Sequence, residues 1–484
     1  MPPDNLKQAA LALKFVVIGG GLAGLACAYA LRTSGHEVVI IEQNASNTKT
    51  DGSIRCPPND FGAVVPKRYG FVLRTLLFLR ASLKFEAGAT SEPVGFMKFY
   101  RQIMSDLGGE FLVLQVHFLR LLLMQSAELS FAVEKHDDLR RQLTYLCLAA
   151  GVDIMTGTAI NIKTVQEYLV YVTLENGGAV QGNIVIGADG HNGFVRAFVT
   201  PDDMEPEHFV TAWVFNSQVD AFVSRTQRVN ISISTDHMLE HEELRSLCEE
   251  NQFTIWMGSG SSMNGVLDTT CETFNLAICT PTLLDLPASN DWYKNCDVAD
   301  LPFDLSEYDP RLKQLIQLGH SCRPTIQPIF EVEDVVSLDG TIVLVGDAAH
   351  CVAMHGSHNT SMAIEDAVTL GALFAHLARR DQIPVLLETY DELRQHRTRA
   401  TQVSEFQSLL QISLPSGEHQ EARDATLRLT NDREFEDFED CYRDAETGVM
   451  SVLVQIWEGY LVQFDHDADE VVDSWWTKWK YMIQ

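Results

Sequence analysis

The feature that most constrains the fold is a glycine-rich turn near the N-terminus. The apolar run at residues 14–18 predicts a β-strand, and the periodicity of residues 22–34 predicts a helix. Between them, Gly19, Gly21 and Gly24 have the Gly-x-Gly-x-x-Gly spacing. The first glycine permits a tight turn, the second lets a pyrophosphate approach the backbone, and the third lets helix and strand pack closely. We therefore predict a Rossmann-like unit that binds a dinucleotide.

An acidic residue at the end of the next predicted strand supports this interpretation. Glu42 closes the strand expected over residues 37–42, where a carboxylate accepts hydrogen bonds from ribose hydroxyls. The alternative is a glycine-rich turn in an ordinary α/β protein. A second pair of glycines, Gly258 and Gly260, lies among alternating strand residues with no helix after it, and predicts a hairpin turn.

The residue pattern divides the chain into three zones. Residues 11–200 mix short apolar strands with helical periodicity, including a helix near 137–150, which is typical of βαβ units. Residues 208–331 alternate between apolar and polar, as expected of an antiparallel sheet. After residue 335 a buried strand leads into three helical segments, near 360–379, 384–409 and 417–430.

Composition excludes several classes of function. The 66 acidic and 36 basic residues give a formal charge of −30, which opposes binding to nucleic acid or anionic membranes. The most apolar stretch, Phe111–Met124, is too short to span a bilayer and contains Arg120. Ten cysteines without a Cys-x-x-Cys pair, and an N-terminus without a signal-peptide pattern, favour reduced thiols and a cytoplasmic location. We expect no bound metal ion.

Two later segments complete a family pattern. Ile186–Arg196 contains Asp189-Gly190, and Val345–His350 contains Gly346-Asp347. With the glycine-rich turn, these motifs resemble the FAD-dependent aromatic hydroxylases of the p-hydroxybenzoate and salicylate hydroxylase type. The resemblance implies that Asp347 binds the ribityl chain of FAD and that Asp189-Gly190 lies beside the cofactor.

The resemblance also implies a fold. It is an α/β fold with a Rossmann-like FAD-binding domain of GR2 type, an inserted antiparallel-sheet substrate domain and a helical C-terminal region. We assign residues 1–200 and 336–410 to the FAD-binding domain, 201–335 to the sheet domain and 411–484 to the helical tail. Four aromatic residues of the sheet domain are candidates to line a substrate cavity or, alternatively, to form plain core: Trp213, Phe215, Trp256 and Phe274.

In enzymes of this type, NAD(P)H reduces bound FAD, O2 adds at flavin C4a, and the resulting hydroperoxide transfers oxygen to an activated ring. We therefore expect FAD and NAD(P)H as cofactors, and O2 and a small aromatic or phenolic molecule as partners, with decarboxylation as a variant reaction. A flavin epoxidase or oxidative cyclase of a polyketide or terpenoid pathway stays open, as does an FAD-binding module without turnover. An oligomer is compatible with the sequence.

The chain departs from the family in two places. Where similar enzymes have proline and then Gly-Gln-Gly, this chain has Met354–Thr360, with His355 and His358 as candidate catalytic hydrogen-bond donors or proton shuttles. The alternative is that both only pack. Where the family has an arginine at a helix start, two places compete in this chain: His136, with Arg140 as a stand-in, and Val116–Leu121, which fits less well. Because the sequence near residues 116–135 is unusually apolar for its position, we also consider the hypothesis that this segment is an insertion.

The candidate cofactor-binding residues are thus spread from the N-terminal turn to the start of the helix after residue 358. They are Gly19, Gly21, Gly24, Glu42, Gly52, Arg55, His136, Arg140, Asp189, Gly190, Gly346, Asp347, Asn359 and Thr360.

Overall fold

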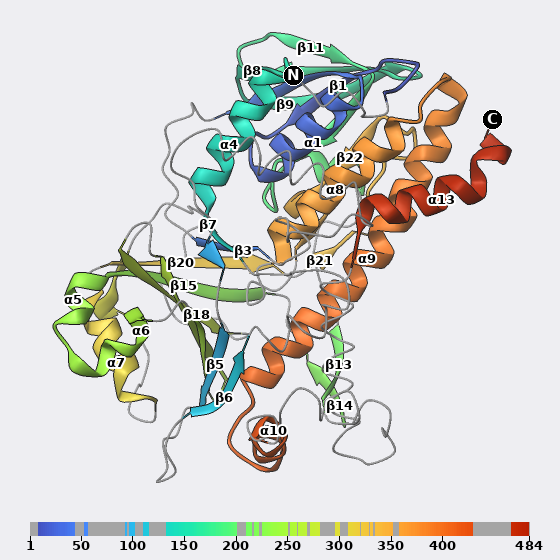
Figure 1. Ribbon diagram of the computed structural model, residues 1–484. Coiled ribbons are helices and arrows are strands. Elements are labelled where there is room, and N and C mark those ends of the chain that lie inside the picture. Colours follow the sequence, from blue (N-terminus) through green and yellow to red (C-terminus); the bar gives the residue numbers. More distant parts are fainter. Residues whose placement is uncertain are drawn as a thin grey trace.

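A computed structural model gives the fold of most of the chain (Figure 1). It describes residues 8–43, 53–56, 92–93, 96–101, 110–115, 132–200, 210–214, 217–221, 225–249, 252–258, 260–268, 272–280, 296–300, 308–319, 321–328, 330–332, 334–351, 358–428 and 466–483. Within these residues, no helix combines the length and the apolar character needed to cross a bilayer.

A five-stranded parallel sheet forms the centre of the cofactor-binding half. Its strand order is β22 (Ile342–Leu344), β12 (Ile184–Gly187), β1 (Lys14–Ile18), β2 (Glu37–Glu42) and β8 (Asp153–Thr156). The middle strands are short runs of Val, Ile and Phe because both faces of a parallel sheet are covered. The predicted βαβ unit is confirmed, with its helix α1 at Leu22–Thr33.

Helices pack on one face of this sheet, and an antiparallel meander packs on the other. Phe15 of β1 packs edge-on against Phe374 at the end of helix α8 (His358–Phe374), so this face meets the helical layer of α1, α4 (His136–Ala149) and α8. Val16 points to the opposite face, because side chains alternate along a strand, and packs beside Gly182. That face carries the antiparallel meander of β9 (Ala159–Gln166), β10 (Leu169–Leu174) and β11 (Ala179–Gly182).

An eight-stranded sheet forms the second half of the molecule. Its order is β19 (Cys296–Asp297), β20 (Ser321–Pro328), β15 (Arg225–Ser234), β18 (Thr273–Thr280), β17 (Ser262–Asp268), β16 (Gln252–Met257), β5 (Phe96–Arg101) and β6 (Glu110–Gln115). The expected antiparallel pairing is confirmed except between β5 and β16, which are parallel. β5 and β6 come from the stretch that the sequence analysis assigned to the first domain.

Helices α5 (Thr235–Leu239), α6 (Ser246–Glu249) and α7 (Pro310–Leu318) cover one face of this sheet and enclose its core. Trp256 and Phe274 are fully buried in that core, and the indole Nε1 of Trp256 donates to Asp309 Oδ2 at 3.0 Å. Of the two alternatives for these residues, plain core is therefore confirmed and cavity lining is not, because strand alternation turns them toward the covering helices. Trp213 and Phe215 lie outside the described side chains. Gly258 and Gly260 lie in the β16–β17 hairpin turn, as predicted.

The long helix α9 (Ile383–Ile412) runs from the parallel sheet to the eight-stranded sheet (Figure 1). At its far end the carbonyl of Ser413 accepts a hydrogen bond from Gly260 N in the β16–β17 turn, at 2.9 Å. Helices α10 (Glu418–Arg428) and α13 (Ala468–Ile483) follow, and α13 packs against α8. One helix thus connects both sheets.

Smaller elements join these units. Strands β3 (Ser53–Cys56), β7 (Ala132–Lys135) and β4 (Glu92–Pro93) form one sheet, while β13 (Val210–Val214) pairs with β14 (Ser217–Ala221) and β21 (Phe330–Glu331) with β23 (His350–Cys351). Short 3-10 helices span Val195–Phe198, Glu242–Leu244, Val298–Asp300, Gly346–Ala348 and Arg380–Gln382. Of the segment 116–135, residues 116–131 lie outside the described residues and β7 forms the rest.

Candidate cofactor site

The glycine-rich turn has the shape that its sequence predicts. Gly19 has a φ of +108°, and a Cβ there would collide with the carbonyl oxygen of Ala188. A Cβ at Gly24 would collide with the carbonyl oxygen of Gly19, so α1 packs directly on the turn. Among the described residues, a Cβ at Gly21 would meet nothing within 4 Å, and no side chain caps the start of α1. The helix N-terminus therefore faces open space, which suits a phosphate group.

Two predicted side chains hold this turn from either side. Glu42, at the end of β2, accepts a hydrogen bond from the backbone N–H of Gly20 through Oε2, at 2.6 Å. Arg140, from α4, donates through Nε to the carbonyl of Gly20 at 3.0 Å. Sequence reasoning named Arg140 as the stand-in for a missing family arginine, and the structure places its guanidinium at the glycine turn. The side chain of His136, at the start of α4, is not described.

The Asp189 turn follows strand β12. Its Oδ2 accepts a hydrogen bond from Val195 N at 3.0 Å, while Oδ1 is buried and has no hydrogen-bond partner in the described part of the chain. Burial raises the pKa of Asp189, against the lowering effect of backbone hydrogen bonds. Gly190 has a φ of +79°, and a Cβ there would meet no atom of the described residues within 4 Å. An acceptor atom and an open glycine are thus available to a ligand.

The Gly346 turn follows strand β22. Gly346 has a φ of +59°, and a Cβ there would stand 2.7 Å from the Cβ of Ala23, so glycine lets this turn touch the start of α1. The next residue, Asp347, is partly buried. Burial raises its pKa to about 6, a shift that His350 opposes and Asp366 adds to.

These three turns and the end of β2 meet because their strands are parallel. Gly19 follows β1, Glu42 ends β2, Asp189 follows β12 and Gly346 follows β22, so all lie at the carboxyl edge of one sheet. In open α/β sheets, ligands bind at this edge. The structure therefore brings together predicted residues that are more than 300 positions apart in the sequence.

Other predicted residues stay predictions. Gly52 and His355 lie outside the described residues, and the side chains of Arg55, in β3, and His358, which begins α8, are not described. Asn359 and Thr360 are half-buried in the first turn of α8. The helix begins before them, so they lie inside its first turn and not ahead of it.

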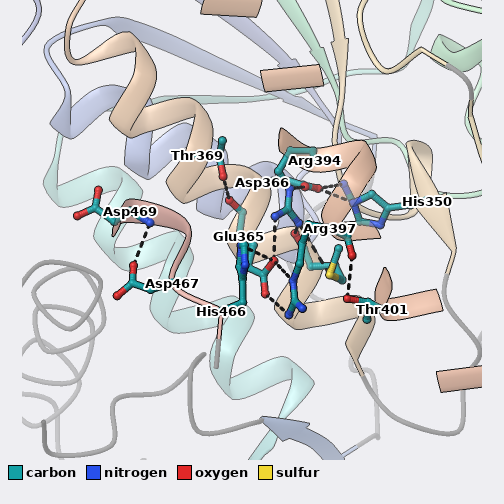
Figure 2. Close-up of polar contacts among 12 residues, drawn as sticks. His350, Glu365, Asp366, Thr369, Arg394, Arg397, Thr401, His466, Asp467 and Asp469 are labelled. Atoms are coloured by element: carbon teal, nitrogen blue, oxygen red, sulfur yellow. Dashed lines mark hydrogen bonds and ion pairs between the residues drawn. The ribbon is translucent and has the colours of Figure 1, made fainter. Parts of the chain in front are cut away.

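Sequence reasoning missed a buried charged cluster behind the Gly346 turn (Figure 2). Asp366 of α8 accepts hydrogen bonds from Gly346 N at 2.7 Å, His350 Nε2 at 2.8 Å and Arg394 Nε at 2.7 Å. Its neighbour Glu365 accepts from Arg394 Nη1 at 2.8 Å and from Arg397 Nη2 at 2.9 Å. Two carboxylates thus meet two guanidinium groups.

The sequence does carry a signal for this cluster. Glu365 and Asp366 are adjacent in a mostly apolar helix, and Arg394 and Arg397 are three positions apart, which places them on one face of the next helix. Buried charges are nearly always paired. The position of the pairing partner, however, depends on how α8 and α9 pack.

Comparison with known proteins agrees with this geometry. Residues 17–48 match the family model of the NAD(P)-binding Rossmann-like domain, and residues 337–406 match that of the FAD binding domain. The first match contains the glycine turn and Glu42, and the second contains the Gly346 turn and the charged cluster. The chemistry of the donors and the open glycines fit a dinucleotide cofactor such as FAD.

Relatives that match most of the chain are named as monooxygenases or hydroxylases. The chain is 22% identical to the FAD-dependent monooxygenase ntnJ of Nectria sp, over 86% of this chain and 90% of that protein. It is 23% identical to 3-hydroxybenzoate 6-hydroxylase 1 of Aquipseudomonas alcaligenes, over 80% of this chain and 86% of that protein. Its fold is similar to that of a salicylate hydroxylase in complex with substrate, with a TM-score of 0.64 and 16% identity over 87% of this chain and 93% of that one.

Proposed function

We propose that this chain uses NAD(P)H and O2 to hydroxylate a phenolic or other aromatic substrate. The comparisons support an FAD-dependent hydroxylase of the aromatic hydroxylase family. One observation carries the proposal. An open glycine turn, the carboxylate of Glu42 and two acidic turns lie together at the carboxyl edge of one parallel sheet. The relatives named as monooxygenases and hydroxylases match the chain over most of its length.

The cofactor would bind along this edge. The uncapped N-terminus of α1 at Gly21 would receive the pyrophosphate, and Glu42, already fixed by the Gly20 amide, would accept from the adenosine ribose. Arg140 would hold the turn in shape through the Gly20 carbonyl. Asp347 would accept from the ribityl chain, and Asp189-Gly190 would border the cofactor.

When bound, FAD would supply the redox chemistry, accepting a hydride from NAD(P)H and activating O2 for transfer of one oxygen atom to the ring. The chain contributes binding, orientation and electrostatics. Peptide N–H groups at the start of α8 would stabilise negative charge on the cofactor. The Asp366–Arg394 pair holds the start of the Gly346 turn in place.

The residues before α8 and the eight-stranded sheet are the parts of the chain that we propose contact the substrate. His355 and His358 are our proposed hydrogen-bond donors or proton shuttles for a substrate hydroxyl. We propose that the substrate contacts the face of the eight-stranded sheet that points away from Trp256 and the covering helices. Helix α9 runs from this sheet to the parallel sheet.

The direct test is reconstitution. Purified protein should be yellow, or become so with added FAD, and should oxidise NADPH or NADH faster when a phenolic acid that it accepts is present. Mass spectrometry should then find a product heavier by one oxygen atom, with the label retained from 18O2. A colourless protein that binds no FAD would refute the proposal, and flavin reduction without an oxygenated product from any phenolic acid would refute the hydroxylase part.

A further inference from the structure

His350 has one ring nitrogen engaged and one unsatisfied. It follows the Gly346–Ala348 turn, and its side chain is 3% exposed. Nε2 lies 2.8 Å from Asp366 Oδ2. Nδ1 is also buried and has no hydrogen-bond partner in the described part of the chain. In Figure 2, His350 lies at one end of the charged cluster, beside Asp366.

The surroundings of Asp366 decide which nitrogen of His350 carries the proton. Asp366 also receives Gly346 N and Arg394 Nε, so its carboxylate acts as an acceptor toward three donors. Burial opposes ionisation of Asp366, but His350, Arg394 and the Gly346 amide together hold its pKa below the usual range. An ionised carboxylate can only accept, so Nε2 of His350 must donate.

Nε2 of His350 carries a proton whether the ring is neutral or charged, because it donates to Asp366. In a neutral imidazole with its proton on Nε2, Nδ1 is a hydrogen-bond acceptor.

A buried acceptor without a donor is destabilising, so native proteins rarely leave one unsatisfied. His350 follows three residues after Asp347, which lies in the Gly346–Ala348 turn. This inference rests on the proposed function, in which Asp347 of that turn would bind the ribityl chain of FAD, whose hydroxyl groups are donors. We propose that His350 is a further cofactor-binding residue, held by Asp366 so that its buried Nδ1 accepts a hydrogen bond from a ribityl hydroxyl of FAD.

Two variants of His350 separate its two nitrogens. In His350→Gln, the amide nitrogen lies where Nε2 was and can still donate to Asp366, but the Nδ1 acceptor is lost. In His350→Asn, the amide oxygen lies near the position of Nδ1 and can accept, but the donor to Asp366 is lost. Apo-protein would be titrated with FAD and the dissociation constant measured from flavin fluorescence.

We expect His350→Gln to weaken FAD binding about tenfold and His350→Asn to weaken it less. The 2′-, 3′- and 4′-deoxyribityl analogues of FAD identify the donor. Loss of the correct hydroxyl should weaken binding to wild type but not to His350→Gln. If His350→Gln binds FAD as tightly as wild type, or if no analogue discriminates between the two proteins, the assignment is wrong and Nδ1 is satisfied by water.

A second measurement needs no variant. The 15N chemical shifts of the imidazole ring in wild-type apo-protein should report a proton on Nε2 and none on Nδ1, and the Nδ1 signal should move upfield when FAD is added. A proton on Nδ1 in the FAD complex would overturn the proposal. Wild type that binds no FAD refutes the proposed function itself, whereas wild type that binds FAD with an unmoved Nδ1 signal refutes only the role of His350.

Discussion

Arg394 Nε lies 2.7 Å from Asp366 Oδ1, in an ion pair that joins helix α9 to helix α8 with both side chains almost fully buried. The same guanidinium donates to Glu365 Oε2 and to the carbonyl of Met362. Asp366 in turn receives the amide of Gly346. The position of the acidic turn thus depends on a charge supplied from another helix.

Replacement of Arg394 by Met should destabilise the protein strongly. Removing one partner of a buried ion pair leaves the other uncompensated, which typically costs about 3–5 kcal/mol. The exposed pair of Arg379 and Asp381 offers a matched control, because Arg379→Met should cost less than about 1 kcal/mol. Denaturant unfolding of the FAD-free proteins measures both. Equal losses of unfolding free energy for the two variants would show that the buried pair contributes no more to stability than the exposed pair.

Replacement of Arg140 by Gln should weaken FAD binding without a large effect on folding. Its Nε supports the Gly20 carbonyl, so its loss frees the turn that would receive the pyrophosphate. We expect a roughly tenfold higher dissociation constant, as for loss of about 1.4 kcal/mol. Arg141→Gln, at the exposed neighbouring position of α4, is the control. If both variants bind FAD like wild type, Arg140 is not the stand-in for the family arginine.

Trp256→Phe should lower stability and leave FAD binding intact. The indole fills the core between the eight-stranded sheet and its helices and donates to the buried carboxylate of Asp309. Losing that hydrogen bond should cost about 1–3 kcal/mol. Thermal unfolding and an FAD titration measure the two effects. A change in FAD or substrate affinity without a loss of stability would restore Trp256 as a cavity residue.

Local pattern was enough to predict much of the fold. Gly19, Gly21, Gly24 and Glu42 are close in sequence, and their spacing alone requires a strand, a turn and a helix. The alternation of residues 229–234 likewise predicted strand β15. Such features depend on neighbouring residues, so a single sequence reveals them.

Features that depend on distant parts of the chain were not predictable. Asp366 and Arg394 are 28 residues apart, and only the packing of α8 on α9 shows that they pair. The periodicity of β16 shows that Trp256 is on one face, but not which face the helices cover. For the same reason, β5 and β6 could not be assigned to the eight-stranded sheet before their pairing was known.

The stability of the FAD-free protein should depend on pH through Asp347. Burial raises its pKa to about 6 from a usual value near 3.8. The folded protein therefore binds the proton more tightly than the unfolded chain does, so stability falls as pH rises between about 4 and 6. Above pH 6 the carboxylate is ionised in the folded and the unfolded chain, and its burial lowers the free energy of unfolding by at most about 3 kcal/mol, at about 1.4 kcal/mol per pKa unit. Asp347→Asn removes this titration.

The informative quantity is the difference in unfolding free energy between wild type and Asp347→Asn from pH 4 to pH 7. It should move against wild type as pH rises and level off above about pH 6, because other titrating groups contribute equally to both proteins. Parallel curves would show that Asp347 titrates normally. With saturating FAD, ribityl hydroxyls that donate to the carboxylate would stabilise its ionised form, so wild type should lose less stability over the same pH interval.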